Sequence, residues 1–216
     1  MKYPKINTLW KRDKNNKFNI IEGSYSCKEF EDIDSWYVTE KIDGTNIRVY
    51  FENEKKTLKF MGRSDNSNIP SYLEAKLFYI FLRIDIKFLS KYKNIVFYGE
   101  GYGDKIQYVG SSYIKNDVDF ILFDILADNV WLNKDEVKNI AEKLSIKVVP
   151  SLGVKTKKEI IDLVKGKPMS EISDIPLKSE GIVATSNPLS FFEDGSPIIF
   201  KLKVKDYEKL KNTDGN

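Results

Sequence analysis

The sequence EKIDGTNIRV, residues 40–49, raises the question that decides the fold. It lies inside a strand-like segment, residues 36–51, whose alternation of apolar and polar residues is interrupted between residues 41 and 46. Lysine, aspartate and glycine are all poor strand formers. The KIDG stretch, residues 41–44, is therefore either a hairpin turn or the position of a nucleophile, and the rest of the chain has to distinguish the two.

The composition excludes several kinds of chemistry. The chain contains no histidine and a single cysteine, Cys27. Ser-His-Asp triads, Cys-His nucleophiles and histidine-ligated zinc are therefore excluded, as is an internal disulfide. An enzyme of this composition has to work with lysine, carboxylates, arginine, tyrosine or a hard metal bound by carboxylates.

Size and charge suggest one ordinary domain. The chain has 216 residues, of which 41% are hydrophobic, so we expect a single domain over residues 1–216. Its net charge is only +3, but lysine clusters at residues 55–59, 155–158 and 201–209 could contact phosphates or form a solvated surface. No membrane-length apolar run or signal-peptide pattern is present, which predicts a soluble cytoplasmic protein.

Apolar periodicity predicts a series of short strands. They are expected at residues 36–51, 57–61, 95–99, 119–127, 146–150, 181–185 and 197–204. The second of these is expected to form a hairpin with the first. Several neighbouring strands are too closely spaced for helical crossovers, so we predict an α+β fold with antiparallel or mixed sheets flanked by helices.

Helical periodicity predicts helices between and after these strands. They are expected at residues 71–92, 134–144, 157–165 and 205–211. Ser71 with Glu74 and Asn133 with Glu136 have the spacing of capping boxes, and Thr156 is expected to cap the third helix. That helix is expected to end near Gly166.

Five short elements place a charged residue in or beside an apolar strand. They are KIDG (41–44), YGEG (98–101), FILFD (120–124), SEGIV (179–183) and FKLK (200–203). Buried charges are costly unless they are paired or metal-bound. Five such elements in one chain indicate that the charges serve one common site.

Each element taken alone has an ordinary structural explanation. These explanations are a hairpin turn, a bulged strand end, a core strand, a turn into a strand and a solvated edge strand. The glycines of YGEGYG (98–103) do not fit the G-x-G-x-x-G spacing of a dinucleotide-binding loop. Lys201 and Lys203 are two residues apart, so they are expected on the same face of a strand.

In their order, the five elements resemble motifs I, III, IIIa, IV and V of the covalent nucleotidyltransferase superfamily, which includes polynucleotide ligases and mRNA capping enzymes. Arg63, in GRSDNS, matches the additional arginine of motif Ia. EKIDGTN (40–46) most resembles the RNA ligase 2-like group, which has EKxxGTN at this point. The opening YPKINTLWKRD (3–13) is similar to that of small RNA-ligase-domain proteins. The resemblance implies the fold of a ligase adenylation domain.

The resemblance implies that Lys41 attacks the α-phosphate of ATP, becomes adenylylated and releases pyrophosphate. An ordinary lysine has a pKa near 10.4, so only about a thousandth is neutral at pH 7.4. Lys201, Lys203 and a divalent metal would favour a neutral amine through like-charge repulsion and would neutralise the phosphates. Asp43 is expected to join these three lysines as a catalytic residue in the later steps.

The remaining site residues are also implied by the resemblance. Phe123 would stack on the purine, Glu40 would read the adenine amino edge, and Glu100 would bind the ribose hydroxyls. Glu180 and Asp43 would hold Mg²⁺ or Mn²⁺. The implied nucleotide-binding residues are Glu40, Lys41, Ile42, Asn46, Arg63, Glu100, Phe123, Lys201 and Lys203.

These roles describe an ATP-dependent RNA ligase acting in RNA repair. AMP would pass from Lys41 to a 5′-phosphate RNA end, and a 3′-hydroxyl would then seal the strand and release AMP. The expected partner is RNA with these two ends, and an RNA end-healing enzyme is a candidate second partner. We expect no membrane association, and the sequence does not indicate which oligomeric state the protein has.

The number of residues after Lys203 bears on which members of the superfamily the sequence resembles. The sequence ends 13 residues after Lys203, so neither the OB-fold domain of DNA ligases and capping enzymes nor the helical domain of RNA ligase 2 is expected. The alternatives are a minimal DNA ligase, a catalytically silent module that binds nucleotide or RNA, and an unrelated α+β domain. Covalent labelling by nucleotide and sealing of RNA or DNA strands would separate them.

Overall fold

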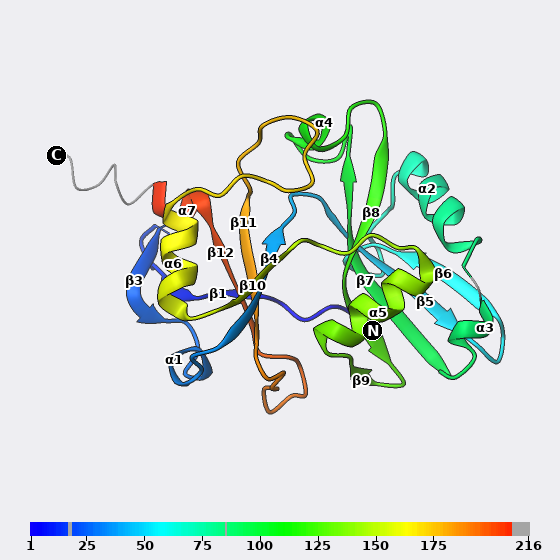
Figure 1. Cartoon of the computed structure of the whole chain (residues 1–216), viewed down its shortest axis with the longest axis horizontal. Coiled ribbons are helices and arrows are strands. Elements are labelled where there is room, and N and C mark those ends of the chain that lie inside the picture. Colours follow the sequence, from blue (N-terminus) through cyan, green and yellow to red (C-terminus); the bar gives the residue numbers. More distant parts are fainter. Residues whose placement is uncertain (17–18, 85, 209–216) are drawn as a thin grey trace. The chain divides into compact units, whose positions relative to one another are not determined.

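The computed structural model describes residues 1–16, 19–84 and 86–208 (Figure 1). The described chain divides into two compact units, each with a sheet and helices, which confirms the α+β prediction. Unit 1 contains Met1–Tyr3, Asp43–Val149 and Ser173–Ile175. Unit 2 contains Pro4–Ile42, Pro150–Ile172 and the described residues from Pro176 onward. None of the described helices is both long and apolar enough to cross a membrane.

Unit 1 is built on a five-stranded antiparallel sheet of order β6-β5-β7-β8-β9 (Figure 1). The strands are β5 (Thr45–Glu52), β6 (Thr57–Met61), β7 (Asn94–Gly103), β8 (Val118–Ala127) and β9 (Val130–Trp131). The helices are α2 (Ser71–Phe81), α3 (Ile86–Leu89), α4 (Gly110–Tyr113) and α5 (Lys134–Leu144). The predicted hairpin of residues 57–61 with the preceding strand is confirmed by the β5–β6 pairing.

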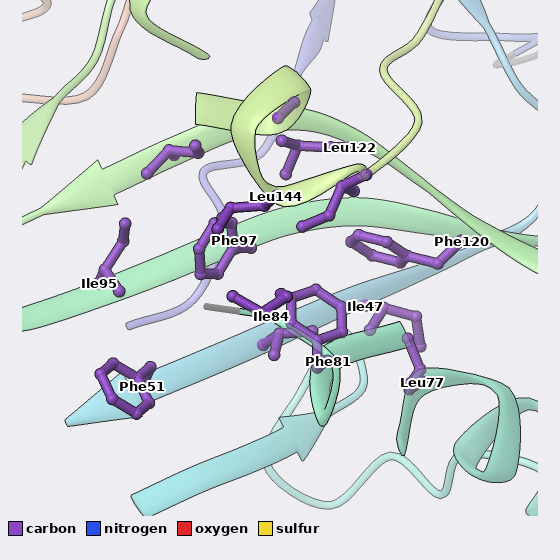
Figure 2. Close-up of a cluster of buried hydrophobic side chains, with 14 of the residues drawn as sticks. Ile47, Phe51, Leu77, Phe81, Ile84, Ile95, Phe97, Phe120, Leu122 and Leu144 are labelled. Atoms are coloured by element: carbon purple, nitrogen blue, oxygen red, sulfur yellow. The ribbon is translucent and has the colours of Figure 1, made fainter. Parts of the chain in front are cut away.

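The core of unit 1 lies between this sheet and the apolar faces of α2 and α5. Ile47 and Phe51 lie on the core-facing side of β5, and Phe97 and Phe120 come from β7 and β8 (Figure 2). Leu77 from α2 and Leu144 from α5 pack in the same cluster. Each fully buried side chain of this kind stabilises the fold by roughly 1.5–3 kcal/mol.

Unit 2 is built on a second five-stranded sheet of order β1-β12-β11-β4-β10. Its strands are β1 (Asn7–Thr8), β4 (Trp36–Lys41), β10 (Ser151–Lys155), β11 (Gly181–Ser186) and β12 (Ile199–Lys203). The β1–β12 pair is parallel and the other pairs are antiparallel, so the sheet is mixed as predicted. A separate hairpin, β2 (Trp10–Arg12) with β3 (Ile20–Tyr25), and the helices α1 (Glu29–Asp32), α6 (Lys157–Lys165) and α7 (Val204–Glu208) complete the unit.

The KIDG stretch does not form a hairpin turn, so that explanation was wrong. β4 ends at Lys41 and β5 begins at Thr45, yet the two strands belong to different sheets and units. The strand interrupts itself because the chain leaves one sheet for the other between Ile42 and Asp43. Gly44 is required at this transition, since a Cβ there would lie 2.3 Å from the carbonyl oxygen of Gly101.

Other predictions needed correction. The helix expected over 71–92 ends at Phe81, and α3 is a separate helix; the apolar pattern continues because Ile84 and Leu89 pack in the same core. Pro70 is its N-cap and no side-chain cap forms, so the Ser71–Glu74 capping box was wrong. Ser71 lies one position too late, inside the first turn.

The strand expected at 146–150 was also wrong. Val148 makes one isolated bridge to Leu122, and β10 starts at Ser151. By contrast, the capping boxes of α5 (Asn133 with Glu136) and α6 (Thr156 with Glu159) are present. The expected terminal helix begins as α7, while residues 209–211 lie outside the described part of the chain.

Candidate active site

Lys41, Glu180 and Lys203 form a cluster in unit 2. The strand register aligns Lys41 with Gly181 across β4 and β11, and Gly181 with Lys203 across β11 and β12. Lys41 Nζ donates to Glu180 Oε2 at 2.6 Å, and Lys203 Nζ pairs with Glu180 Oε1. One carboxylate therefore bridges two ammonium groups, and all three side chains are no more than 21% exposed.

Gly181 makes this cluster possible. Its φ is +152°, and a Cβ there would lie 2.1 Å from the carbonyl oxygen of Leu202 and 2.7 Å from Cα of Lys203. A larger residue would push β11 away from β12. The glycine of the SEGIV element thus holds Glu180 close to Lys203.

The charges around Glu180 favour its ionised form. Burial by itself would raise the pKa of Glu180, but the charges and hydrogen bonds of Lys41 and Lys203 outweigh it and lower that pKa below its ordinary value. Sequence reasoning expected Lys41 to be surrounded by cations. The structure instead places a carboxylate, that of Glu180, between Lys41 and Lys203.

Lys201 lies on the same face of β12 as Lys203, which confirms that prediction. Lys201 pairs with Val183 and Lys203 with Gly181, two positions apart in an unbroken register. The alternative of a solvated edge strand was wrong, because β12 lies between β1 and β11.

Glu40 and Ile42 flank the nucleophile candidate and are buried. Strand alternation places Glu40 on the face of β4 that carries Trp36 and Val38, opposite the face of Lys41. Glu40 Oε2 accepts from the backbone N–H of Glu171 at 2.9 Å, whereas Glu40 Oε1 is buried without a hydrogen-bond partner among the described residues. The backbone oxygen of Ile42 accepts from Lys41 Nζ at 3.4 Å.

The environment of Glu40 makes a pH-dependent prediction. Burial raises the pKa of Glu40, and the hydrogen bonds from Ser170 and Glu171 offset this only in part. A carboxyl with a raised folded-state pKa contributes stability below its unfolded pKa of about 4.3, and that contribution is lost as pH rises. We expect the stability of Glu40→Gln relative to wild type to increase from pH 4 to pH 8, measured by urea unfolding.

A matched control is Glu193→Gln, because Glu193 is an exposed carboxylate of the same unit and, unlike Glu171, its charge does not shift the pKa of Glu40. This variant is expected to follow the wild-type pH profile much more closely. A stability difference for Glu40→Gln that stays constant with pH would show that Glu40 titrates alike in the folded and unfolded chains.

The remaining predicted residues lie in unit 1, and three of them share one face of its sheet. Asn46 on β5 pairs directly with Glu100 on β7, and Glu100 pairs with Ile121 on β8. Asn46 Oδ1 is buried and has no hydrogen-bond partner in the part of the chain that the structure describes. Phe123 lies farther along β8 on this face, opposite the face occupied by Leu122 and the main core.

Phe123 sits at a β-bulge. Tyr98 pairs with Asp124 and Gly99 pairs with Leu122, so Phe123 is the extra residue of β8. A bulge shifts the alternation of a strand by one position. Here the shift turns Asp124 away from the apolar core and lets Ile125 enter it.

Two groups that support the predicted residues were missed by sequence reasoning. Tyr3 packs edge-on against Phe123 at 5.0 Å between ring centroids, and its hydroxyl donates to Asp124 at 2.5 Å. Lys134 Nζ donates to Asp124 at 2.6 Å. The aspartate in an apolar strand was the available signal, but its partners lie far away in the sequence.

Arg48 is the second missed group. It is 1% exposed, and its Nε donates to the carbonyl oxygen of Gly62 at 2.7 Å while Nη2 donates to Asp65 at 2.9 Å. These bonds hold both sides of Arg63, which is itself exposed. Asp43 lies where the chain enters unit 1, and its backbone N–H donates to the Tyr113 hydroxyl at 3.2 Å.

The sequence of this chain matches the RNA ligase family model over residues 34–203, which is more than half of the 216 residues. The chain belongs to the RNA ligase family. The match begins just before β4 and ends with β12, so it includes every predicted site residue of this RNA ligase family member. No curated protein matches the sequence.

Solved RNA ligases have the same fold. A Naegleria gruberi RNA ligase mutant with ATP and Mn is 22% identical at a TM-score of 0.63, covering 84% of this chain and 54% of that one. The same enzyme with PPi is 22% identical at a TM-score of 0.63, covering 97% of this chain and 64% of that one. An archaeal ATP-dependent RNA ligase is 17% identical at a TM-score of 0.63, covering 96% of this chain and 50% of that one. This family member therefore spans between half and two thirds of the length of these solved chains.

Proposed function

We propose that this chain is an ATP-dependent RNA ligase that carries AMP on Lys41. The observation that supports this most strongly is the Lys41–Glu180–Lys203 cluster, which joins three motifs far apart in the sequence within a family match. A lysine, a carboxylate and a second lysine on adjacent strands suit the transfer of a negatively charged phosphoryl group.

In the first step, the amine of Lys41 attacks the α-phosphorus of ATP. An N–P bond forms, the bond from this phosphorus to the oxygen bridging to the β-phosphate breaks, and pyrophosphate leaves. Lys203 and Lys201, on the same side of the sheet as Lys41, would offset the charge on the α-phosphate and on the leaving group.

In the later steps, a 5′-phosphate of RNA takes AMP from Lys41, and a 3′-hydroxyl then displaces AMP to seal the strand. We assign Asp43 and Asn46 to these steps. The buried amide oxygen of Asn46, to which no described residue donates a hydrogen bond, supports a ligand contact for this side chain.

We assign the sugar contacts and the stacking contact with the base to residues of unit 1. Glu100 would bind the ribose hydroxyls and Phe123 would stack on the purine, with Arg63 contacting ribose or the terminal nucleotide. The common sheet face of Glu100 and Phe123 supports this assignment. In unit 2, the free Oε1 of Glu40 supports its role as acceptor for the adenine amino group, and Ile42 belongs to the same nucleotide-binding stretch.

A divalent metal fits at Glu180 only in a restricted way. Within the residues that the structure describes, no three Asp, Glu, Cys or His side chains are grouped closely enough to hold a metal. Each carboxylate oxygen of Glu180 is ion-paired with a lysine, one with Lys41 and one with Lys203. Mg²⁺ or Mn²⁺ would therefore replace a lysine at one of these oxygens, and its other ligands would be water and phosphate oxygens. Its charge would lower the cost of the developing negative charge.

The organisation of the protein is part of this proposal. We take residues 1–216 as one nucleotidyltransferase domain in function, although the chain forms two compact units. The proposed catalytic lysines and Glu40 belong to unit 2, and Arg63, Glu100 and Phe123 belong to unit 1.

The Phe123 assignment predicts a loss of nucleotide affinity. Phe123→Ala is expected to weaken ATP binding by about 1–3 kcal/mol, because an aromatic platform for the base is removed. Calorimetric titration with ATP measures this directly. Phe123→Trp should retain affinity, and unchanged binding by Phe123→Ala would mean that another aromatic residue stacks. Phe120 is a poor substitute because it is 1% exposed in the main core.

Intact mass of the purified protein tests the proposed function. The wild-type chain is incubated with ATP and Mg²⁺ or Mn²⁺, and in parallel with GTP and NAD⁺, before and after treatment with pyrophosphate. The expected result is a gain of one AMP with ATP that pyrophosphate reverses. No gain from folded protein that carries no AMP beforehand would favour a silent binding module. Sealing of nicked RNA against nicked DNA would then separate the two ligase classes.

A further inference from the structure

The outer face of α2 carries aromatic and cationic residues in alternation. Tyr72, Lys76, Tyr79 and Arg83 follow one another at spacings of four, three and four residues, so they form one stripe along the helix and the turn after it. The opposite face of α2 is buried through Leu73, Leu77 and Phe81. Tyr72 is 41% exposed and Tyr79 is 56% exposed.

One cation of this stripe, Arg83, lies over an aromatic ring, whereas the other, Lys76, donates from Nζ to Asp117 at 2.7 Å. The guanidinium of Arg83 lies 3.7 Å from the ring centroid of Tyr79. The pattern continues beyond α2, where Lys91 Nζ lies 4.7 Å from the Tyr92 ring and 5.3 Å from the Phe88 ring. We call these seven residues the α2–α3 surface: Tyr72, Lys76, Tyr79, Arg83, Phe88, Lys91 and Tyr92.

This segment has an excess of positive charge in its sequence. Between residues 71 and 93 there are five basic residues and two acidic ones, and acidic residues outside the segment pair with two of the five, Asp117 with Lys76 and Glu54 with Lys93. An exposed aromatic surface is costly to leave in water, and one that carries a positive charge suits a partner with flat apolar rings and negative charges. Single-stranded nucleic acid has both.

We propose that the α2–α3 surface binds a single-stranded segment of RNA. Bases would stack on Tyr72 and Tyr79, and phosphates would pair with Arg83 and Lys91. From Tyr72 to Arg83 the helix rises about 16 Å, which matches about five nucleotides at ~3.4 Å each. The choice of RNA rests on the proposed function, but the surface consists of other residues than the Lys41 cluster and extends the proposed function to substrate capture.

A second copy of the chain fits this surface less well. In a two-fold symmetric dimer the same patch meets itself, so its excess of positive charge would face an equal excess. Like charges brought together in this way oppose association. Self-association through this surface is therefore an outcome to test for.

The test is binding of a fluorescent 12-nucleotide single-stranded RNA to the full chain, by anisotropy at several KCl concentrations. The variant Tyr72→Ala with Tyr79→Ala is expected to raise Kd at least about tenfold, since each base stack contributes about 1–3 kcal/mol. Tyr79→Phe keeps the ring and should bind like wild type. Arg83→Ala should reduce the salt slope by about 0.7.

The controls remove similar groups elsewhere. Phe191→Ala removes an aromatic residue that is 47% exposed in unit 2, and Lys138→Ala removes a lysine whose side chain is 66% exposed on α5. Both are expected to retain RNA affinity and salt slope. Circular dichroism and melting of each variant confirm that the fold is intact.

Two outcomes would overturn the inference. Unchanged RNA affinity in the double tyrosine variant would show that RNA binds elsewhere, and a dimer in sedimentation that dissociates in this variant would identify the surface as a homodimer interface. In the double tyrosine variant, AMP transfer to Lys41 is expected to be unchanged, as measured by intact mass. If wild type fails to take up AMP but its RNA binding still depends on the tyrosines, the proposed function fails and this inference stands.

Discussion

Replacing Lys41 with alanine is expected to abolish covalent AMP uptake, with a loss of at least about a thousandfold. The nitrogen of the Lys41 side chain is the proposed bond-forming atom, and alanine has no nucleophilic group to replace it. The folded state should survive, because Lys41 lies at the end of β4 and is 21% exposed. Intact mass after incubation with ATP and Mn²⁺ measures uptake, and thermal melting measures the fold.

Two further variants separate chemistry from charge. Lys41→Arg keeps a cation beside Glu180 but removes the nucleophilic amine, so it should be as inactive as Lys41→Ala and closer to wild type in stability. Lys155→Ala removes a lysine from β10 of the same sheet and should take up AMP normally. An AMP adduct on Lys41→Ala would move the nucleophile to another residue.

Removing the carboxylate of Glu180 is expected to slow adenylylation by about 10²–10³. Loss of the ion pair with Glu180 would release the amine of Lys41 from the carboxylate, so loss of the pair alone would not slow the reaction. A slower reaction in Glu180→Ala therefore reports a separate role, which we propose is to hold the metal and orient Lys203. Single-turnover rates of AMP uptake at saturating ATP and Mn²⁺ make the measurement.

The comparison needs two controls. Glu180→Gln keeps most of the shape but lacks the charge, and it should remain impaired if the metal is the reason. Glu193→Ala removes an exposed carboxylate of the same unit and should react like wild type. A rate for Glu180→Ala at or above that of wild type would limit Glu180 to pairing with the lysines.

Features set by local chemistry could be predicted from the sequence. Two helix N-termini could be predicted because the side chains of Asn133 and Thr156 cap the helices that follow them. The common face of Lys201 and Lys203 follows from strand alternation. The resemblance of the motifs gave the family. Each of these depends on residues that are neighbours in the sequence or on their order.

Features set by distant partners could not be predicted. A strand that turns back and a strand that moves to another sheet have the same local pattern, so residues 41–44 were ambiguous. The bulge at Phe123 depends on the pairing of β8 with β7. The bond from Tyr3 to Asp124 joins residues 121 positions apart, and nothing near Asp124 identifies Tyr3 as its partner.

The division of the chain also bears on how the protein is made. Most of unit 1 is one continuous segment, Asp43–Val149, whereas unit 2 is assembled from three segments. β4, which carries Lys41, takes its neighbours β10 and β11 from residues 151–186. Since chains fold from the N-terminus as they are synthesised, unit 1 has nearly all of its sequence before the sheet that holds Lys41 can close. Lys41, the proposed nucleophile, is translated early and reaches its final setting late.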